Sequence, residues 1–190
     1  MHVYMERLSD FTMALILIAI FFVPMLLIAL WIKVTSKGPV LYWSDRVGVN
    51  NTIFRMPKFR TMHCEAPTVA THLLENYGQY LTPIGAFLRK TSLDELPQIY
   101  SILKGDIRLV GPRPALFNQQ DLIELRTQTG IHQLLPGLTG WAQINGRDTL
   151  SIPEKVKLDQ EYLIKRSLFF DLKILWRTVI QVFRRDGITH

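Results

Sequence analysis

The stretch around which the rest of the chain is organised reads Arg89-Lys-Thr-Ser-Leu-Asp-Glu-Leu-Pro-Gln98. Ser92 and Glu95 have the spacing of a capping box, and apolar residues follow at helical intervals, which predicts a helix that begins at or one residue after Ser92. Gly105 is suited to end that helix. A helix that begins at Pro97 is the alternative, because a proline inside the first interpretation removes a backbone hydrogen bond. In both cases Asp94 and Glu95 lie at the entrance of a helix.

The two adjacent acids follow two bases, Arg89 and Lys90. The first turn of a helix offers unpaired N–H groups and the positive end of the helix dipole, which suit an anion such as phosphate. A carboxylate there, with Arg89 nearby, could hold Mg²⁺, attack a phosphate, or do both. A simple capping role explains the same residues, and this stretch alone favours that role.

The composition narrows the class of protein. The 190 residues suffice for one domain, and the net charge of +6 favours acidic partners such as nucleic acid, anionic lipid or phosphorylated substrates. Cys64 is the only cysteine, so a disulfide framework and a cysteine-based zinc site are excluded. The chain also lacks an H-E-x-x-H pattern, a G-x-x-x-x-G-K-[ST] loop and a dinucleotide-binding fingerprint.

An uncharged apolar run extends from Phe11 to Ile32, long enough to cross a bilayer core of roughly 30 Å. It is too long for a typical signal peptide, and no small-residue cleavage site follows it. Pro24 near its middle predicts a kink or a break. Two topologies remain, a kinked spanning helix and a helix–break–helix that enters and leaves on one face. Bases on both sides are compatible with two cytoplasmic ends: Arg7 before the run, and Lys33, Lys37 and Arg46 after it.

Residues 40–48 and 52–62 read as two strands around Asn50-Asn51, which predicts a β-hairpin. In an extended chain Lys58 and Arg60 share one face of the second strand. The alternative is a solvated basic edge strand, which is common.

Two prolines, Pro112 and Pro114, fix the backbone on both sides of Arg113. The planar guanidinium of a rigid arginine matches an oxyanion, so Arg113 is a candidate phosphate or uracil contact. A surface arginine in an ordinary proline-bounded loop is the alternative. A short strand is expected before this loop, at residues 107–109, and a helix after it, at residues 115–129.

The segment Pro136–Arg147 is dense in turn residues around Trp141, and we expect it to lie outside the core, over a site or at a membrane interface. From Ile152 onward the pattern is helical. An apolar stripe at steps of four and three predicts an amphipathic helix in a membrane interface, with packing on the domain core as the alternative. The stripe consists of Leu168, Leu172, Leu175, Val179 and Val182.

Taken in order, these motifs resemble the bacterial sugar transferase family, the monotopic polyprenol-phosphate phosphoglycosyl transferases. The resemblance covers nearly the whole chain, and in it the N-terminal helix is re-entrant, although Val23 stands where the family often has serine before the proline. The motifs are Lys58-Phe-Arg-Thr-Met62, Arg89 with Asp94-Glu-Leu-Pro-Gln98, Leu103-Lys-Gly-Asp106, Gly111-Pro-Arg-Pro114 and Pro136-Gly-Leu-Thr-Gly-Trp-Ala-Gln-Ile-Asn-Gly-Arg147.

The resemblance implies a reaction. A UDP-sugar, taken here to carry an N-acetylated amino sugar, would donate its sugar-1-phosphate to undecaprenyl phosphate and release UMP, the first membrane step in the assembly of a surface or glycoprotein glycan. The same reaction with UDP-glucose or UDP-galactose is the alternative. A non-enzymatic alternative is a membrane scaffold that binds anionic lipid.

The resemblance also implies residue roles. Asp94 would form a covalent phosphoglycosyl-aspartate and bind Mg²⁺, and Glu95 would assist it. Arg89 would hold the phosphate of the acceptor, and Arg113 the nucleotide. Lys58 and Arg60 would make further phosphate contacts.

The expected architecture is one helix-rich α/β, membrane-anchored domain. Residues 1–36 would form the re-entrant membrane helix, and residues 37–190 a cytoplasmic catalytic domain with a small hairpin and C-terminal amphipathic interfacial helices. We expect it at the cytoplasmic face of the bacterial inner membrane, in contact with lipid and not with nucleic acid. A homo-oligomer is compatible with the sequence, which does not specify the oligomeric state, the sugar or the pathway.

Overall fold

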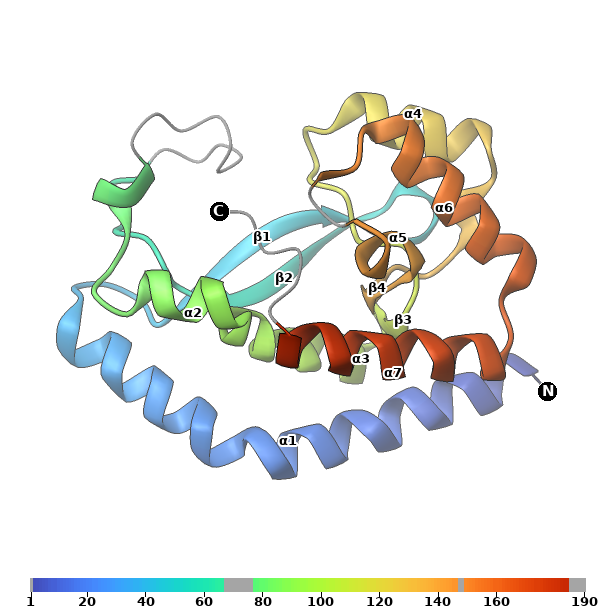
Figure 1. The fold of residues 1–190 in the computed structure, drawn as a ribbon. Coiled ribbons are helices and arrows are strands. Elements are labelled where there is room, and N and C mark those ends of the chain that lie inside the picture. Colours follow the sequence, from blue (N-terminus) through green and yellow to red (C-terminus); the bar gives the residue numbers. More distant parts are fainter. Residues whose placement is uncertain (1, 67–76, 147–148, 185–190) are drawn as a thin grey trace.

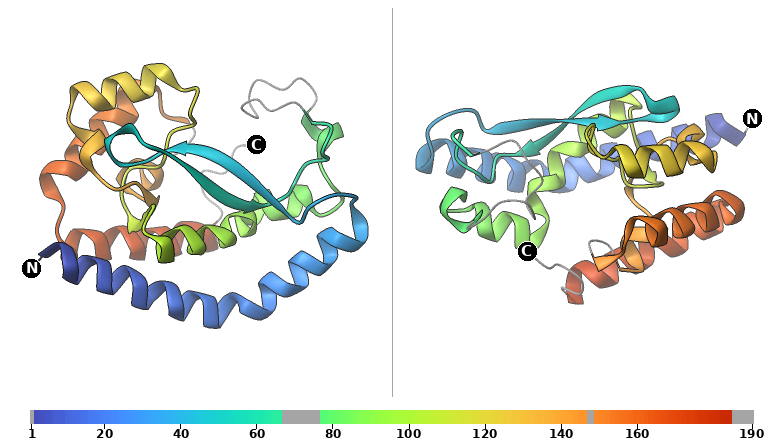
Figure 2. Two further views of the ribbon diagram at one scale, coloured as in Figure 1. Left: turned by 180° about the vertical axis from the view of Figure 1, so that it is seen from behind. Right: turned by 90° about the horizontal axis from the view of Figure 1, so that it is seen from above.

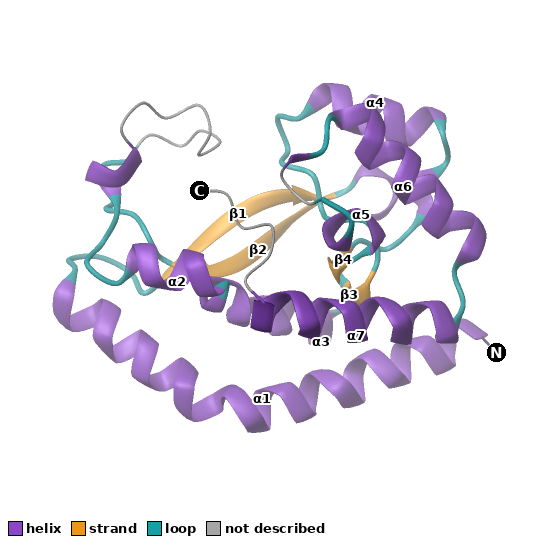
Figure 3. Cartoon of the chain, in the orientation of Figure 1, coloured by secondary structure: helices purple, strands orange, loops and turns teal. Residues whose placement is uncertain are grey.

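The computed structural model describes residues 2–66, 77–146 and 149–184. These residues are mostly helical and contain a pair of small two-stranded sheets, which confirms a helix-rich α/β domain (Figures 1 and 3). The α-helices are α1 (His2–Thr35), α2 (Gly85–Thr91), α3 (Ile99–Lys104), α4 (Gln120–Gln128), α5 (Trp141–Ile144), α6 (Ile152–Lys165) and α7 (Leu168–Arg184). The strands are β1 (Leu41–Val47), β2 (Ile53–Phe59), β3 (Arg108–Val110) and β4 (Gly137–Thr139), and short 3₁₀-helices cover Val49–Asn51, Tyr77–Tyr80, Leu93–Gln98 and Ile131–Gln133.

Helix α1 is long, apolar and bent (Figure 1). Its length and composition suit a membrane segment over Glu6–Thr35, with a mean hydropathy of 3.0 in its most apolar window and only 11% of that window buried in the protein. This exposure does not fit a core helix, which would hide its apolar surface. The backbone stays helical through Pro24, so the expected break is a bend that the missing proline N–H allows.

Both ends of α1 pack on the same domain. At the N-terminal end Glu6 and Asp10 pair with Arg108, and Ala14, in the same half of the helix, is fully buried in the main core with Ile102 of α3. Ile28 and Ile32, near the other end, pack against Phe59 and residues of α2. In Figure 1 the helix runs along the lower edge of the molecule and rises at its C-terminal end to meet β1 and α2.

The predicted hairpin is confirmed. Strands β1 and β2 pair antiparallel from Val47 opposite Ile53 to Leu41 opposite Phe59. Asn50 and Asn51 both take left-handed conformations, which asparagine tolerates in tight turns. The ladder ends at Phe59, one residue before Arg60, so the expected alternation of Lys58 and Arg60 does not continue along a strand.

The central stretch differs from the capping-box prediction. Ser92 ends α2 with a left-handed φ of 56° and makes no side-chain cap bond. Leu93–Gln98 is a 3₁₀-helix, and the α-helix begins only at Ile99. In an α-helix that began at Ser92, Pro97 would lack the N–H needed for a backbone hydrogen bond, and its ring would clash with the backbone of the preceding turn. The prediction of a helix start at Ser92 was therefore wrong. Gly105 ends α3 with φ 93°, as predicted.

The segment Pro136–Arg147 contributes to the core, contrary to expectation. Strand β4 pairs parallel with β3, and Ile144 of α5 is 6% exposed in the main core. The pairing depends on close backbone contact, because a Cβ on Gly137 would lie 2.1 Å from the amide nitrogen of Gly111. Arg147 lies outside the described residues.

Helix α7 both packs on the core and presents an apolar stripe outward. Ile174 is fully buried, whereas Leu168, Leu172, Trp176 and Val179 are exposed, Trp176 by 67%. The amphipathic helix is therefore confirmed, and α7 runs along the same lower edge as α1 (Figures 1 and 2). The side chain of Val182 lies outside the description.

Candidate active site

The two acids lie where three parts of the chain meet. The chain turns at Ser92, which has a left-handed backbone conformation and ends α2, and the following 3₁₀-helix packs against β2. This arrangement places Asp94 and Glu95 beside Lys58, near the end of the hairpin. Asp94 is 9% exposed, so the carboxylates are largely removed from solvent.

Glu95 is held between two bases. Its Oε1 accepts hydrogen bonds from Lys58 Nζ at 2.8 Å and from Arg113 Nη2 at 2.7 Å. Both pairs are partly buried and charge-assisted, which makes them geometrically restrictive. The structure therefore brings together Lys58, Glu95 and Arg113, which come from separate segments.

Asp94 is bound less tightly. In the described part of the chain its carboxylate accepts no hydrogen bond, and its ion pair with Lys58 spans 3.9 Å. Burial raises the pKa of Asp94, and the charge of Glu95 adds to this, while Lys58, Arg89 and Arg113 act in the opposite direction. A buried carboxylate near bases but without hydrogen-bond donors is suited to act as a nucleophile, because its lone pairs are available.

Arg89 comes from the last turn of α2. Its Nε donates to Thr61 Oγ1 at 2.9 Å, and its charge favours the ionised form of Asp94. Thr61 lies just after β2 and is 7% exposed. Arg89 is thus positioned within electrostatic range of Asp94, beside the acids.

Arg46 of β1 is a site residue that sequence reasoning missed. Its Nε donates to Ser44 Oγ at 3.0 Å and its Nη1 to Pro114 O at 3.2 Å. Burial, then the neighbouring Arg113, lowers the pKa of Arg46 to about 10, although Glu95 acts in the other direction. The available signal was position, since Arg46 and Ser44 lie two apart on one face of the predicted strand.

Arg60 lies elsewhere. Its guanidinium is bonded to the backbone at the end of α1, to Ser36 O at 3.0 Å and to Lys37 O, and also to Ser36 Oγ. Arg60 is 5% exposed. The structure does not bring it to the acids, and its role as a phosphate contact stays a prediction.

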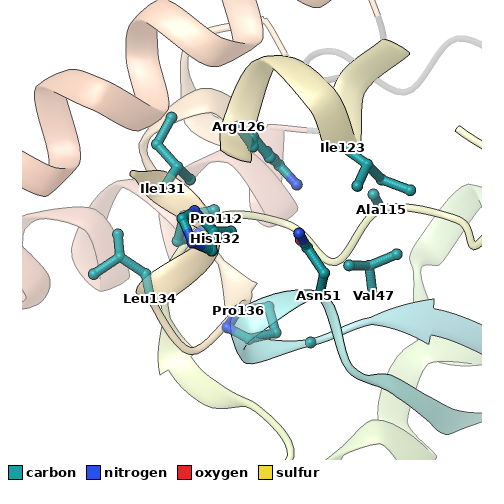
Figure 4. A pocket seen from close by; sticks show the side chains of 11 residues that line it. Val47, Asn51, Pro112, Ala115, Ile123, Arg126, Ile131, His132, Leu134 and Pro136 are labelled. Atoms are coloured by element: carbon teal, nitrogen blue, oxygen red, sulfur yellow. The ribbon is translucent and has the colours of Figure 1, made fainter. Parts of the chain in front are cut away.

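The loop that carries Arg113 is supported from behind. Arg126 donates to the carbonyl oxygen of Arg113 at 2.8 Å and pairs with the buried Asp159 at 2.6 Å. The Gly111 N–H donates to Thr139 O, so both sides of the loop are fixed. A small hollow beyond this loop is lined by Arg126 and mostly apolar side chains, and neither acid lines it (Figure 4).

The acids also fit the expected metal. The described residues contain no group of three or more His, Cys, Asp or Glu side chains that could hold a metal ion by themselves. Mg²⁺ needs no such cage, because it commonly uses one or two carboxylates together with substrate phosphates and water. Among the described residues, the Asp94 carboxylate has only a long ion pair with Lys58, whereas the Glu95 carboxylate contacts both Lys58 and Arg113 closely. Asp94 is therefore the better candidate ligand.

These features define a buried acid pair surrounded by bases, on a domain with an exposed apolar helix. The chain belongs to the bacterial sugar transferase family, whose model matches residues 1–185. It is 40% identical to the "uncharacterized sugar transferase EpsL" of Bacillus subtilis, over 97% of this chain and 90% of that protein.

Two further relatives are longer. The UDP-glucose:undecaprenyl-phosphate glucose-1-phosphate transferase of Escherichia coli is 38% identical over 94% of this chain and 40% of its own length. The undecaprenyl-phosphate galactose phosphotransferase of Salmonella typhimurium is 35% identical over 97% of this chain and 41% of its own length. The chain thus spans about two fifths of these two relatives.

Proposed function

We propose that this protein transfers a sugar-1-phosphate from a UDP-sugar to undecaprenyl phosphate and releases UMP. The observation that carries the proposal is the buried acid pair, Asp94 and Glu95, with Lys58 and Arg113 on Glu95 and Arg89 near Asp94. With Arg46 the bases outnumber the acids, and this surplus of positive charge is complementary to a diphosphate. Relatives named for this reaction give independent support.

In the proposed first step, an Asp94 carboxylate oxygen attacks the β-phosphorus of the donor. A bond forms between Asp94 and that phosphorus as the bond to the bridging oxygen breaks, and UMP leaves with the bridging oxygen and its electron pair. The absence of hydrogen-bond donors on Asp94 in the described chain leaves its oxygens available for this attack. Mg²⁺, held by Asp94 and the diphosphate, would supply charge neutralisation there.

In the second step, a phosphate oxygen of undecaprenyl phosphate attacks the same phosphorus. The bond to Asp94 breaks, the carboxylate is regenerated, and the product is undecaprenyl-diphosphate-sugar. Arg89 would orient the acceptor phosphate, and Arg113 the phosphate of the nucleotide. Glu95 keeps Lys58 and Arg113 in place through its two ion pairs.

We also propose that α1 enters and leaves the membrane on the cytoplasmic face of the bacterial inner membrane. Its N-terminal end, through Glu6 and Asp10, and its C-terminal end, through Ile32, both contact the catalytic domain, which a helix that crosses the membrane cannot do. The exposed stripe of α7 lies along the same edge and would rest in the headgroup region (Figure 1). The acceptor phosphate could then reach the acids without leaving the membrane.

The identity of the donor sugar is a separate part of the proposal. An N-acetylated amino sugar stays a prediction, and no described contact identifies a sugar pocket. The plain-hexose alternative has the support of relatives named for glucose and galactose.

A donor screen tests the reaction. Purified protein with Mg²⁺ would be incubated with each of several UDP-sugars, first without and then with undecaprenyl phosphate. We expect about one UMP per protein without acceptor, a sugar-phosphate mass on the peptide that contains Asp94, and sustained UMP release with acceptor. Absence of UMP release from every donor would favour a non-enzymatic scaffold, and an adduct on another residue would refute Asp94 as the nucleophile.

A further inference from the structure

The charges that flank the apolar run of α1 do not explain a re-entrant topology. Before the apolar run the chain has one Lys or Arg, Arg7, together with Glu6 and Asp10. After the run come Lys33 and Lys37 and then the basic catalytic domain. Lys and Arg determine orientation and acids contribute little, so this bias favours an N-terminus across the membrane. Contacts must therefore hold the N-terminal end on the catalytic side.

Such contacts converge on Arg108, at the start of β3. Arg108 Nη1 lies 3.0 Å from Glu6 Oε2, its Nε 3.4 Å from Asp10 Oδ2, and its Nη2 3.5 Å from Asp171 Oδ2. We call these four residues the Arg108 clasp. Two of its acids come from α1 and the third from α7, so one guanidinium joins both helices to the sheet.

The clasp is enclosed and anchored in the domain. Asp10 is 6% exposed, and its Oδ1 accepts the Leu109 N–H at 3.3 Å. On the other side, the hydroxyl of the buried Tyr162 donates to Asp171 Oδ1 at 2.9 Å. The acids of α1 are thus paired with domain groups in a site largely removed from water, where ion pairs are poorly screened.

Arg7 makes a second attachment beside the clasp. Its guanidinium donates to the carbonyl oxygens of Ile102 and Leu103, in the last turn of α3. A cation at this end of a helix satisfies unpaired carbonyls and complements the helix dipole. The one basic side chain that could retain the N-terminus by charge is therefore also used for a direct contact.

We propose that the Arg108 clasp determines the topology of α1, by holding its N-terminal end on the catalytic face against the charge bias of the flanking residues. This inference rests on the proposed membrane placement of α1. Without Arg108 the clasp keeps only acids, and the packing that pulls the N-terminus back to the domain is lost. Bending at Pro24 permits the re-entrant path, and the clasp selects it.

Cysteine labelling in intact bacteria tests the clasp. The background is the full chain with Cys64→Ser and Val3→Cys, which places its only thiol in the first turn of α1, before the apolar run. We expect a membrane-impermeant maleimide to label this protein only after the cells are permeabilised. Arg108→Met, which leaves the charges flanking α1 unchanged, should become labelled in intact cells. Arg108→Lys, which keeps a cation, should be labelled less than Arg108→Met.

A second variant and a control keep the test independent of folding. Glu6→Gln with Asp10→Asn removes only the α1 half of the clasp and leaves Arg108, Asp171 and Tyr162 to support the domain; it should also gain external labelling. Lys104→Gln removes a nearby base whose partner, Asp106, lies outside the clasp, and should stay protected. Circular dichroism of the detergent-purified proteins verifies the fold.

The outcomes separate the two proposals. External labelling of the background protein itself would overturn the re-entrant placement proposed above, whatever the clasp does. Protection of the background together with protection of both clasp variants would leave that placement intact and overturn the clasp. Labelling of both clasp variants, with the Lys104→Gln protein protected, is the result expected.

Discussion

The same four-residue pattern occurs at two places in this chain and gives two different structures. Ser151-Ile-Pro-Glu154 begins α6 as a capping box, in which Glu154 Oε2 accepts both the Ser151 N–H at 2.8 Å and the Ser151 hydroxyl at 2.7 Å. Ser92-Leu-Asp-Glu95 makes no such bonds, and its glutamate faces Lys58 and Arg113. One pattern therefore starts a helix, and the other builds a site.

The position of proline accounts for the difference. Pro153 stands in the first turn of α6, where a missing N–H costs nothing because that N–H has no partner within the helix. Pro97 stands five residues after Ser92, where an α-helix needs the N–H. The chain there takes a left-handed turn and a 3₁₀-helix, which frees the side chains of Asp94 and Glu95 from capping.

The two regions also differ in charge energetics. The side-chain hydrogen bond from Ser151, followed by its backbone N–H, lowers the pKa of Glu154, so the folded protein favours its ionised form. Burial raises the pKa of Asp94, so the folded protein disfavours its ionised form. The ionised Glu154 thus stabilises the start of α6, whereas burial of Asp94 destabilises the folded protein. Such a loss of stability is common at functional sites.

The largest effect is expected for Asp94→Asn. If Asp94 is the nucleophile, the amide should lower turnover by at least about 1,000-fold, because it cannot form the acyl phosphate. The melting temperature should stay the same or rise, since a buried charge is removed. Turnover comes from steady-state UMP release, and stability from thermal unfolding in detergent.

A matched control for this variant is Asp121→Asn. Asp121 is an acid in the first turn of α4, which is the role that Asp94 would have under a simple capping interpretation. Its loss should cost roughly 0.3–1 kcal/mol of stability and leave turnover unchanged. Near-normal turnover by Asp94→Asn would place Asp94 in the same category as Asp121.

The next largest effect distinguishes Glu95 from Glu154, the glutamates that end the two four-residue patterns. Glu95→Gln keeps the side-chain shape but removes the charge that holds Lys58 and Arg113, and should lower turnover roughly 100-fold. Glu154→Gln should leave turnover unchanged. Equal turnover in the two variants would contradict the comparison.

Glu154→Gln should instead alter the pH dependence of stability. Because its folded pKa is lowered, Glu154 contributes stability above its usual pKa, and that contribution is lost as the pH falls through the folded value. Unfolding curves of wild type and Glu154→Gln should therefore differ at neutral pH and converge in acid.

Arg113→Ala should act on donor binding rather than on the fold. Its guanidinium lies 2.7 Å from Glu95, and Arg126 fixes its backbone, so the loop should persist without the side chain. We expect KM for the UDP-sugar to rise roughly 10–100-fold, with a smaller rise for Arg113→Lys, which keeps charge but loses the planar fork. An unchanged KM in the alanine variant would remove Arg113 from the donor site.

Much of the fold could be predicted from the sequence, because the patterns that determine it are local. The apolar run of α1, the Asn50-Asn51 hairpin and the helix end at Gly105 each depend on a few adjacent residues. The parallel pairing of β3 with β4 was missed, because the glycines that allow its close backbone contact also look like loop residues.

Less of the site could be predicted from the residues alone. Spacing placed Asp94 and Glu95 together, but their association with Lys58 and Arg113 came from the family resemblance. Arg46 was missed because an arginine in a two-stranded hairpin normally faces solvent, and only tertiary packing turns it inward. Arg60 was placed by an alternation that ends one residue too early.

The smallest effect is the change in folding stability when Ser92 or Ser151 is replaced by glycine. Its sign should differ between the two serines, which makes it the sharpest test of the comparison. Ser151→Gly removes a cap side chain and should lower stability by a few tenths of a kcal/mol, and Ser151→Ala by about 1 kcal/mol. Ser92 makes no cap bond and has φ 56°, a conformation that costs other residues more than glycine. Ser92→Gly should therefore raise stability by up to about 1 kcal/mol, and Ser92→Ala should lower it. Thermal unfolding of the four variants in one detergent gives the order, and a loss of stability in Ser92→Gly as large as that in Ser151→Ala would mean that Ser92 caps a helix after all.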